Sequence, residues 1–179
     1  MQEKKNKESN LKWPIQAFFL TFVLSGVVSF ISNNGIEKLN VFLSVIILIA
    51  VVLIGIIFDI IGIAVTIAPE EDFHAKATKK AEGAKTSLNL IKNATKVANF
   101  CADVIGDICG VISGAAGTTI AAILITQYHY NALLVGLIIT AVISSLTIGG
   151  KAIGKSFAIN KSDIILYEFA KFIHNFYKA

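Results

Sequence analysis

Long apolar runs, several of them about twenty residues or more, constrain this chain more than any other feature of its sequence. A helix rises 1.5 Å per residue, so about 20 mostly apolar residues cross a hydrocarbon core of roughly 30 Å. Hydrophobic residues make up 55% of the 179 residues and charged residues 16%, which leaves too little polar surface for a soluble globule. The sequence therefore predicts an all-α membrane protein and excludes the soluble enzyme folds.

The apolar runs predict about four transmembrane helices. They cover residues 13–31, 41–68, 97–126 and 132–149. The first run follows a polar, basic tail, residues 1–12, as the core of a secretory signal peptide would. Such a core has about 7–15 residues and ends at a small-residue cleavage site, which the sequence SFISNNG does not supply. We therefore expect the first run to be retained as an extra N-terminal transmembrane helix.

Between the second and third runs, residues 70–96 are rich in charge, with acids first and lysines after them. That order suits a helix macrodipole. Apolar residues recur at steps of three and four and form one stripe: Phe73, Ala77, Ala81, Ala84, Leu88, Ile91 and Ala98. The pattern predicts amphipathic juxtamembrane helices, with Gly83 as a point where the helix can break. The stripe can lie on the membrane surface or dock on the membrane bundle, and the sequence leaves both open.

The last segment, residues 162–178, has a second amphipathic pattern. Ser162 or Asp163 can cap its first turn. Its apolar face contains Ile165, Phe169, Phe172 and Phe176. This pattern predicts a C-terminal helix at the membrane interface.

The lysines indicate how the chain is oriented, because basic residues accumulate in short loops on the cytoplasmic side. Nearly all of them lie in the N-terminal tail, in residues 70–97 and near the C-terminus, whereas the loops after the first and third runs contain only Lys38. We expect a multi-pass protein of the cell (plasma) membrane with cytoplasmic N- and C-termini. Every basic residue is a lysine and none is an arginine, which argues against nucleic acid as a partner.

Four charged residues fall in or beside the apolar runs: Asp59, Asp103, Asp107 and Lys151. A charge at the bilayer centre costs roughly 2.5–3.5 kcal/mol on insertion scales, so such residues have a partner, a proton or a function. Asp103 and Asp107 are four residues apart, which on an α-helix places them on one face. Their repulsion favours a hard cation such as Mg²⁺ or Ca²⁺, or a shared proton, between them.

The acids therefore predict a metal site with Asp103 and Asp107 as core ligands and Asp59 in support. The alternative is structural. Lys151 could neutralise Asp107 or Asp103 in a buried ion pair, since intramembrane charges commonly pair with one another.

A ridge of glycines, Gly106, Gly110 and Gly114, follows the acids on the third run. Such a ridge lets a neighbouring helix approach closely, and helix packing is the interpretation we favour. It also offers a close contact for a homodimer. The alternative is that a locally unwound helix exposes carbonyl oxygens at an ion site.

Catalytic and zinc-binding patterns are not evident in the sequence. Cys101 and Cys109 lie in an apolar run, which supports neither a disulfide framework nor a zinc site. No serine, threonine or cysteine has an accompanying base, so we do not expect an enzyme.

Three sequence segments resemble the DUF21 transmembrane domain of the CNNM/CorC (CorB) family of magnesium transporters. FDIIGIAVT, residues 58–66, is similar to the family's F-S-G-S-E-T-A-L-T. FHAKATKKAEGAKTSLNLIKN, residues 73–93, is similar to its basic juxtamembrane helices. GKAIGKSFAINKSDII, residues 150–165, resembles G-E-I-x-P-K-(S/T)-x-A-x-x-x-(A/P)-x-x-I. The three segments occur in the family's order, and the resemblance covers residues 41–173.

The resemblance implies a Mg²⁺-transporting membrane domain that pairs as a homodimer. The family's G-N-N-x-x-N span, whose asparagine oxygens help to hold the ion, would place Asp103 and Asp107 at the first and last asparagine positions. The sequence also departs from the family. Lys151 replaces the acid of G-E-I-x-P-K, and Gly154 replaces its proline. The CBS pair that follows the family's membrane domain is not in this sequence, so we expect no nucleotide gating of that type within the chain.

Three hypotheses about function follow. The leading one is a transporter or channel-like protein for divalent cations, most simply Mg²⁺. The second is a non-transporting membrane protein of the same fold, in which Lys151 neutralises the acids and the amphipathic helices bind a separate, regulatory partner. The third couples the carboxylates to Na⁺ or H⁺ as titrating relay groups, and the sequence does not separate it from the first.

Overall fold

The computed structural model describes residues 41–178 and, before them, a few single helical residues. These are Ile15, Phe18, Phe19, Phe22, Val23, Gly26, Val27 and Phe30. The predicted tail, residues 1–12, lies outside the described residues, and so does most of the predicted span over residues 13–31. The described part of the chain is helical and contains no strand.

Three of the described helices are long and apolar enough to cross a membrane. The first is α2 (Val41–Ile67), and the third is α7 (Ala132–Asn160). The second runs without a break from Ala94 to Tyr128 and consists of α5 (Ala94–Asn99), the π-helix η1 (Phe100–Ile105) and α6 (Gly106–Tyr128). Many of their large apolar side chains are exposed, as in helices that face lipid. The predicted class, an all-α membrane protein, is confirmed.

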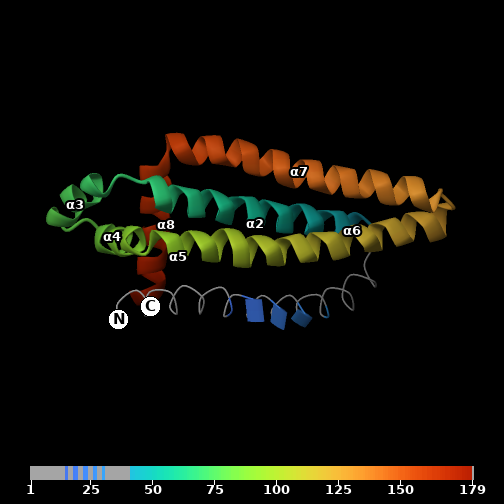
Figure 1. The fold of residues 1–179 in the computed structure, drawn as a ribbon, viewed down its shortest axis with the longest axis horizontal. Coiled ribbons are helices and arrows are strands. Elements are labelled where there is room, and N and C mark those ends of the chain that lie inside the picture. Colours follow the sequence, from blue (N-terminus) through green and yellow to red (C-terminus); the bar gives the residue numbers. More distant parts are fainter. Residues whose placement is uncertain are drawn as a thin grey trace, which may run out of the picture. The chain divides into compact units, whose positions relative to one another are not determined.

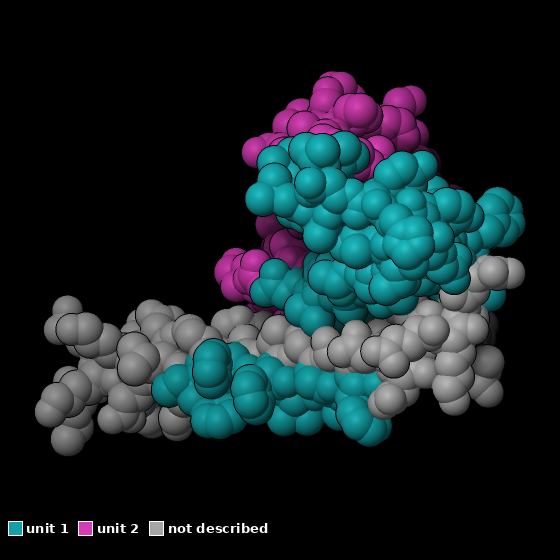
Figure 2. Space-filling model, turned by 90° about the vertical axis from the view of Figure 1, so that its right-hand side faces the viewer, with its two compact units in different colours: residues 1–51, 107–141 teal, residues 52–106, 142–179 magenta. Residues whose placement is uncertain are grey.

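The chain forms two compact units, coloured separately in Figure 2. The first unit contains residues 1–51 and 107–141, and the second contains residues 52–106 and 142–179. The first unit includes α6 and the start of α7. There the amide of Leu133 donates a hydrogen bond of 3.0 Å to Oδ1 of Asn131, which caps the first turn of α7.

In the second unit the chain leaves α2 through Pro69 and enters α3 (Glu70–Thr78). Proline suits this place because it fixes its own backbone and lacks the amide that a continuing helix would need. Glu70, Glu71 and Asp72 form the first turn of α3, where acidic groups interact favourably with the helix dipole.

Gly83 separates α3 from α4 (Ala84–Lys92) in the second unit. Its φ of +79° lies in the left-handed region that favours glycine. A Cβ at Gly83 would also lie 3.1 Å from the backbone nitrogen and Cα of Lys171 in α8 (Ser162–Lys178). The turn therefore needs glycine both for its conformation and for its contact with α8.

The core of the second unit joins α2, α3, α4 and α8. Val65, Phe73 and Leu166 are almost completely buried there. Packed against them are Ile61, Leu88, Leu90, Ile91, Ala94, Val97 and Tyr167. The apolar stripe of residues 70–96, for which the sequence left two places open, thus packs on protein in this unit.

Small residues on α7 allow it to pack closely on α2 in the second unit. A Cβ at Gly154 would lie 2.7 Å from Cγ1 of Ile60, and one at Gly150 would overlap Ile56. Ala158, a further four residues along, is fully buried. The span predicted over residues 132–149 lies within α7, and the helix itself continues to Asn160. Gly150, Gly154 and Ala158 lie in this continuation.

Candidate charged site in the membrane helices

The charged site in the second unit is an ion pair between two membrane helices. Nζ of Lys151 in α7 lies 3.6 Å from Oδ1 of Asp59 in α2. Their side chains are 34% and 18% exposed, respectively, so both are half-buried. The distance exceeds that of ordinary N–H···O hydrogen bonds, which makes this an ion pair without a close hydrogen bond.

The packing of α7 on α2 brings these two charges together. Lys151 follows Gly150, which rests on Ile56, and Asp59 is three residues beyond Ile56 on the same helix. Lys151 thus lies next to the glycines through which α7 contacts α2. Our alternative interpretation expected Lys151 to pair with Asp107 or Asp103, and its carboxylate partner in the structure is instead Asp59.

Gly106 lies beside the ammonium group of Lys151. A Cβ at Gly106 would be 3.6 Å from Nζ of Lys151 and 3.9 Å from the carbonyl oxygen of Cys101. Both are ordinary van der Waals distances, so the ammonium group lies beside Gly106 at a place where a Cβ would also fit. Gly106 was predicted to pack against another helix, and in the structure its neighbour is this charged side chain.

Asp103 lies in the π-helix η1, three residues before Gly106, and is exposed on the surface of the second unit. The amide of Gly106 donates to the carbonyl oxygen of Cys101, five residues before it, as in a π-helix. Short π-helical segments inside α-helices occur frequently at functional sites. The predicted stacking of Asp103 over Asp107 assumed an α-helical turn, and η1 departs from that periodicity.

Asp107 lies in the first turn of α6 and is exposed. Among the described residues, no salt bridge involves Asp103 or Asp107, and no group of three or more His, Cys, Asp and Glu side chains is placed to hold a metal ion. The roles of Asp59, Asp103 and Asp107 as metal ligands stay predictions.

Gly110 and Gly114, the other members of the predicted ridge, are exposed on α6. Within the described part of the chain, no atom other than its own helix backbone lies within 4 Å of a Cβ built at either glycine. The described contacts therefore include no helix that packs on these two glycines, and their role in helix packing stays a prediction.

Sequence reasoning missed the pairing of Lys151 with Asp59. A signal was present, because Gly150, Gly154 and Ala158 form a small-residue ridge at four-residue steps around Lys151. That ridge identifies the face of α7 that packs on a neighbouring helix. It does not identify which apolar run supplies the neighbour.

No protein-family model matches this chain, and neither a curated protein nor a solved structure is similar to it. The resemblance to the DUF21 domain rests on the three quoted sequence segments alone. The fold and the site define a class: an all-α membrane protein with an ion pair between two helices that are able to span the bilayer.

Proposed function

We propose that this protein transports a divalent cation, most simply Mg²⁺, and that the Asp59–Lys151 pair controls access to its acidic groups. The observation that carries the proposal is the ion pair itself, at 3.6 Å between Nζ and Oδ1. Lys151 serves as a tethered cation that neutralises Asp59 while no metal ion is bound. An incoming cation competes with the ammonium group for the carboxylate.

The charge balance of the spanning helices suits a dication. Three carboxylates, those of Asp59, Asp103 and Asp107, and one ammonium group, that of Lys151, have a formal net charge of −2. Hard cations prefer such carboxylate oxygens, and Mg²⁺ commonly keeps several waters beside one or two carboxylates. The π-helical setting of Asp103 adds support, because that geometry recurs at functional sites.

The test is Mg²⁺ flux into proteoliposomes that contain the purified chain and a Mg²⁺-sensitive dye. We expect flux in the wild type, and its loss in Asp59→Asn and in an Asp103→Ala, Asp107→Ala double variant. Glu71→Gln is the control, because Glu71 is exposed on α3, outside the spanning helices. Flux that persists in both acid variants would remove the carboxylates from the mechanism.

A pH gradient across the same vesicles addresses coupling to protons, and a Na⁺ gradient addresses coupling to sodium. Carboxylates that act as relay groups would make Mg²⁺ flux depend on one of these gradients. Flux that responds to neither gradient would favour simple, uncoupled movement of the dication.

The ion pair also favours a second candidate, a non-transporting membrane protein in which Lys151 is a permanent counter-ion. In this case the amphipathic segments bind a separate regulatory partner. Folded, correctly inserted protein that shows no flux, together with strong energetic coupling between Asp59 and Lys151, would support this candidate over transport.

We also propose that the protein pairs as a homodimer through the exposed glycines of α6. Gly110 and Gly114 permit close approach of a second helix. Gly114→Cys, in a background in which Cys101 and Cys109 are replaced by serine, should cross-link in native membranes. An exposed position on α7, Leu137→Cys, is the control, and equal cross-linking at both positions would contradict this interface.

A further inference from the structure

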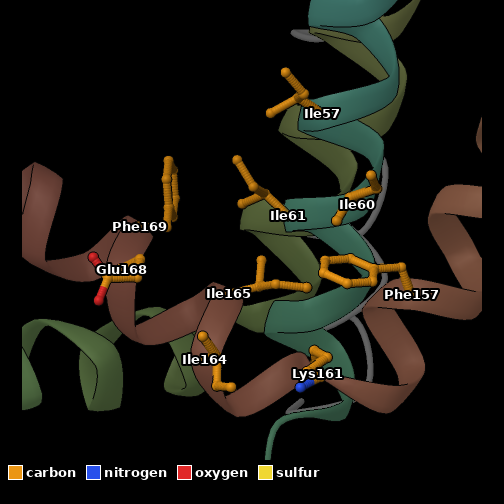
Figure 3. Close-up of a pocket in the computed structure, with 9 residues that line it drawn as sticks. All are labelled: Ile57, Ile60, Ile61, Phe157, Lys161, Ile164, Ile165, Glu168 and Phe169. Carbon is orange, nitrogen blue, oxygen red and sulfur yellow. The ribbon is translucent and has the colours of Figure 1, made fainter.

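The second unit contains an open, apolar pocket of about 580 Å³ that the charged site does not use. Figure 3 shows its walls. Isoleucines of α2, among them Ile57 and Ile61, form one side, and Phe157 lies on α7. Ile165 and Phe169 of α8 form the other side, and the ring of Phe169 points back along α2 toward the level of these isoleucines.

The orientation of α8 places this pocket at the level of a membrane surface. Within the second unit, α8 crosses the ends of α2 and α7 at a steep angle (Figures 1 and 3). Because α2 and α7 are able to span the bilayer, a helix that crosses them lies along its surface. The pocket then opens where the acyl chains of the lipid meet their headgroups.

The two long faces of α8 have different surroundings. Leu166 and Ala170 are fully buried in the core of the second unit. On the face that continues from Phe169, Phe172 is 68% exposed and Phe176 is 80% exposed. An apolar stripe next to the end of a spanning helix is typical of an interfacial helix that rests on lipid.

Two oppositely charged side chains also line the pocket, Lys161 at the junction of α7 and α8, and Glu168 on α8. Both residues are exposed. The salt bridges formed by the described residues include neither of them. Their charges are thus available to a ligand, and they sum to zero.

We propose that this pocket binds a phospholipid with a zwitterionic headgroup, and specifically phosphatidylethanolamine. An acyl chain occupies the apolar walls between Ile61 and Phe169, where it removes apolar surface from the interfacial water. Lys161 pairs with the phosphate, and Glu168 accepts hydrogen bonds from the primary ammonium group.

The charges of the pocket select this headgroup over two common alternatives. Phosphatidylglycerol offers a phosphate to Lys161 and no cation to Glu168. Phosphatidylcholine has the cation, but its trimethylammonium group has no N–H donor. Of these three headgroups, only ethanolamine supplies both a phosphate and a hydrogen-bonding cation.

The experiment uses the full chain in vesicles that contain photoactivatable phosphatidylethanolamine with a diazirine in its acyl chain. Matched phosphatidylglycerol and phosphatidylcholine probes are compared, and the cross-linked peptides are mapped by mass spectrometry. We expect labelling at residues 57–61 and 165–169. The ethanolamine lipid should label these residues about threefold to fivefold more than either alternative, as an exposed ion pair would give.

Charge variants test the headgroup assignment. Glu168→Gln should remove the preference for the ethanolamine lipid while the labelled positions stay the same. Lys161→Gln should reduce labelling by all three lipids. Glu71→Gln and Lys155→Gln change exposed charges of the same types that do not line the pocket, and both should behave as the wild type does.

The wild-type chain alone can overturn the proposal, so it does not depend on whether a variant folds. Equal labelling by the three lipids, or a preference for phosphatidylglycerol, would contradict the headgroup assignment. Absence of label at residues 57–61 and 165–169, with label elsewhere on the spanning helices, would contradict the site and would indicate that protein covers the pocket. None of these outcomes depends on Mg²⁺ flux.

Discussion

Asp59 and Lys151 show how charged residues can be accommodated in helices that are otherwise apolar. A charge at the centre of a bilayer costs roughly 2.5–3.5 kcal/mol, and Asp59 and Lys151 lie nearer the ends of α2 and α7. Together, at 3.6 Å, each provides the other with a counter-ion, and the ammonium group lies beside Gly106. The pair therefore offsets the free-energy cost of burying each charge, and it adds little to the net stability of the fold.

The first prediction at this scale concerns the coupling between the two charges. Asp59→Asn and Lys151→Met should each lower the free energy of unfolding by roughly 2 kcal/mol, because each leaves an uncompensated charge. The double variant should be more stable than the sum of the two losses implies, by at least about 1 kcal/mol. Reversible unfolding in mixed micelles measures these values, and Lys155→Met is the control. Simple additivity would contradict a direct interaction.

A second residue-scale prediction concerns the turn before α4. Gly83→Ala should lower the free energy of unfolding by about 1–2 kcal/mol, since alanine is strained at a φ of +79°. The backbone of Lys171 adds a steric cost, because it would lie 3.1 Å from the new methyl group. Gly149→Ala, at an open position inside α7, should be neutral or stabilising in the same assay. Equal effects of the two substitutions would argue against this account of Gly83.

At the scale of elements, the contact of α7 with α2 determines where the charged site forms. Gly150 and Gly154 bring the two helices together, and Ile56 and Ile60 fill the space above the glycines. In a membrane such packing is an important source of helix association, because lipid is as apolar as the side chains themselves. A change in this contact should therefore move Lys151 relative to Asp59.

Gly154→Ala tests this relation. Its methyl group would lie 2.7 Å from Cγ1 of Ile60, so we expect a loss of about 1–3 kcal/mol from overpacking. The coupling energy between Asp59 and Lys151 should fall in the same variant. Gly136→Ala, in the first half of α7 and open to its surroundings, is the control. Unchanged coupling in Gly154→Ala would separate the ion pair from the helix contact.

For the molecule as a whole, hydropathy predicted more of the structure than it did of the site. Apolar runs predicted the class and three long apolar helices of the described residues, because length and composition suffice to identify a candidate membrane helix. The burial of Phe73 in the protein core could not be predicted from the sequence, because an amphipathic stripe has the same pattern whether it faces lipid or protein.

The partner of Lys151 did not follow from the sequence either. Periodicity places residues on one face of a helix, and it does not state which helix lies opposite. The spacing of Asp103 and Asp107 was interpreted with an α-helical turn, and η1 has no sequence signature that would have warned against this. The first gap concerns tertiary packing, and the second concerns local helix geometry.

Orientation is also a property of the whole molecule, and it can be tested directly. Lys85→Cys in α4 and Tyr130→Cys in the loop before α7 are introduced with Cys101 and Cys109 replaced by serine. A membrane-impermeant thiol reagent on intact cells should label position 130 and not position 85, because basic residues accumulate on the cytoplasmic side of a membrane. The reverse pattern would contradict the predicted orientation.

The central claim is that Lys151 acts as a tethered cation that competes with Mg²⁺ for Asp59. The most direct measurement is the Mg²⁺ concentration that gives half-maximal flux in proteoliposomes, compared between the wild type and Lys151→Gln, with Lys155→Gln as the control. Removal of a competing charge at this distance should lower that concentration roughly tenfold. A half-saturating concentration that is unchanged in Lys151→Gln, in protein that is folded and inserted, would contradict the claim.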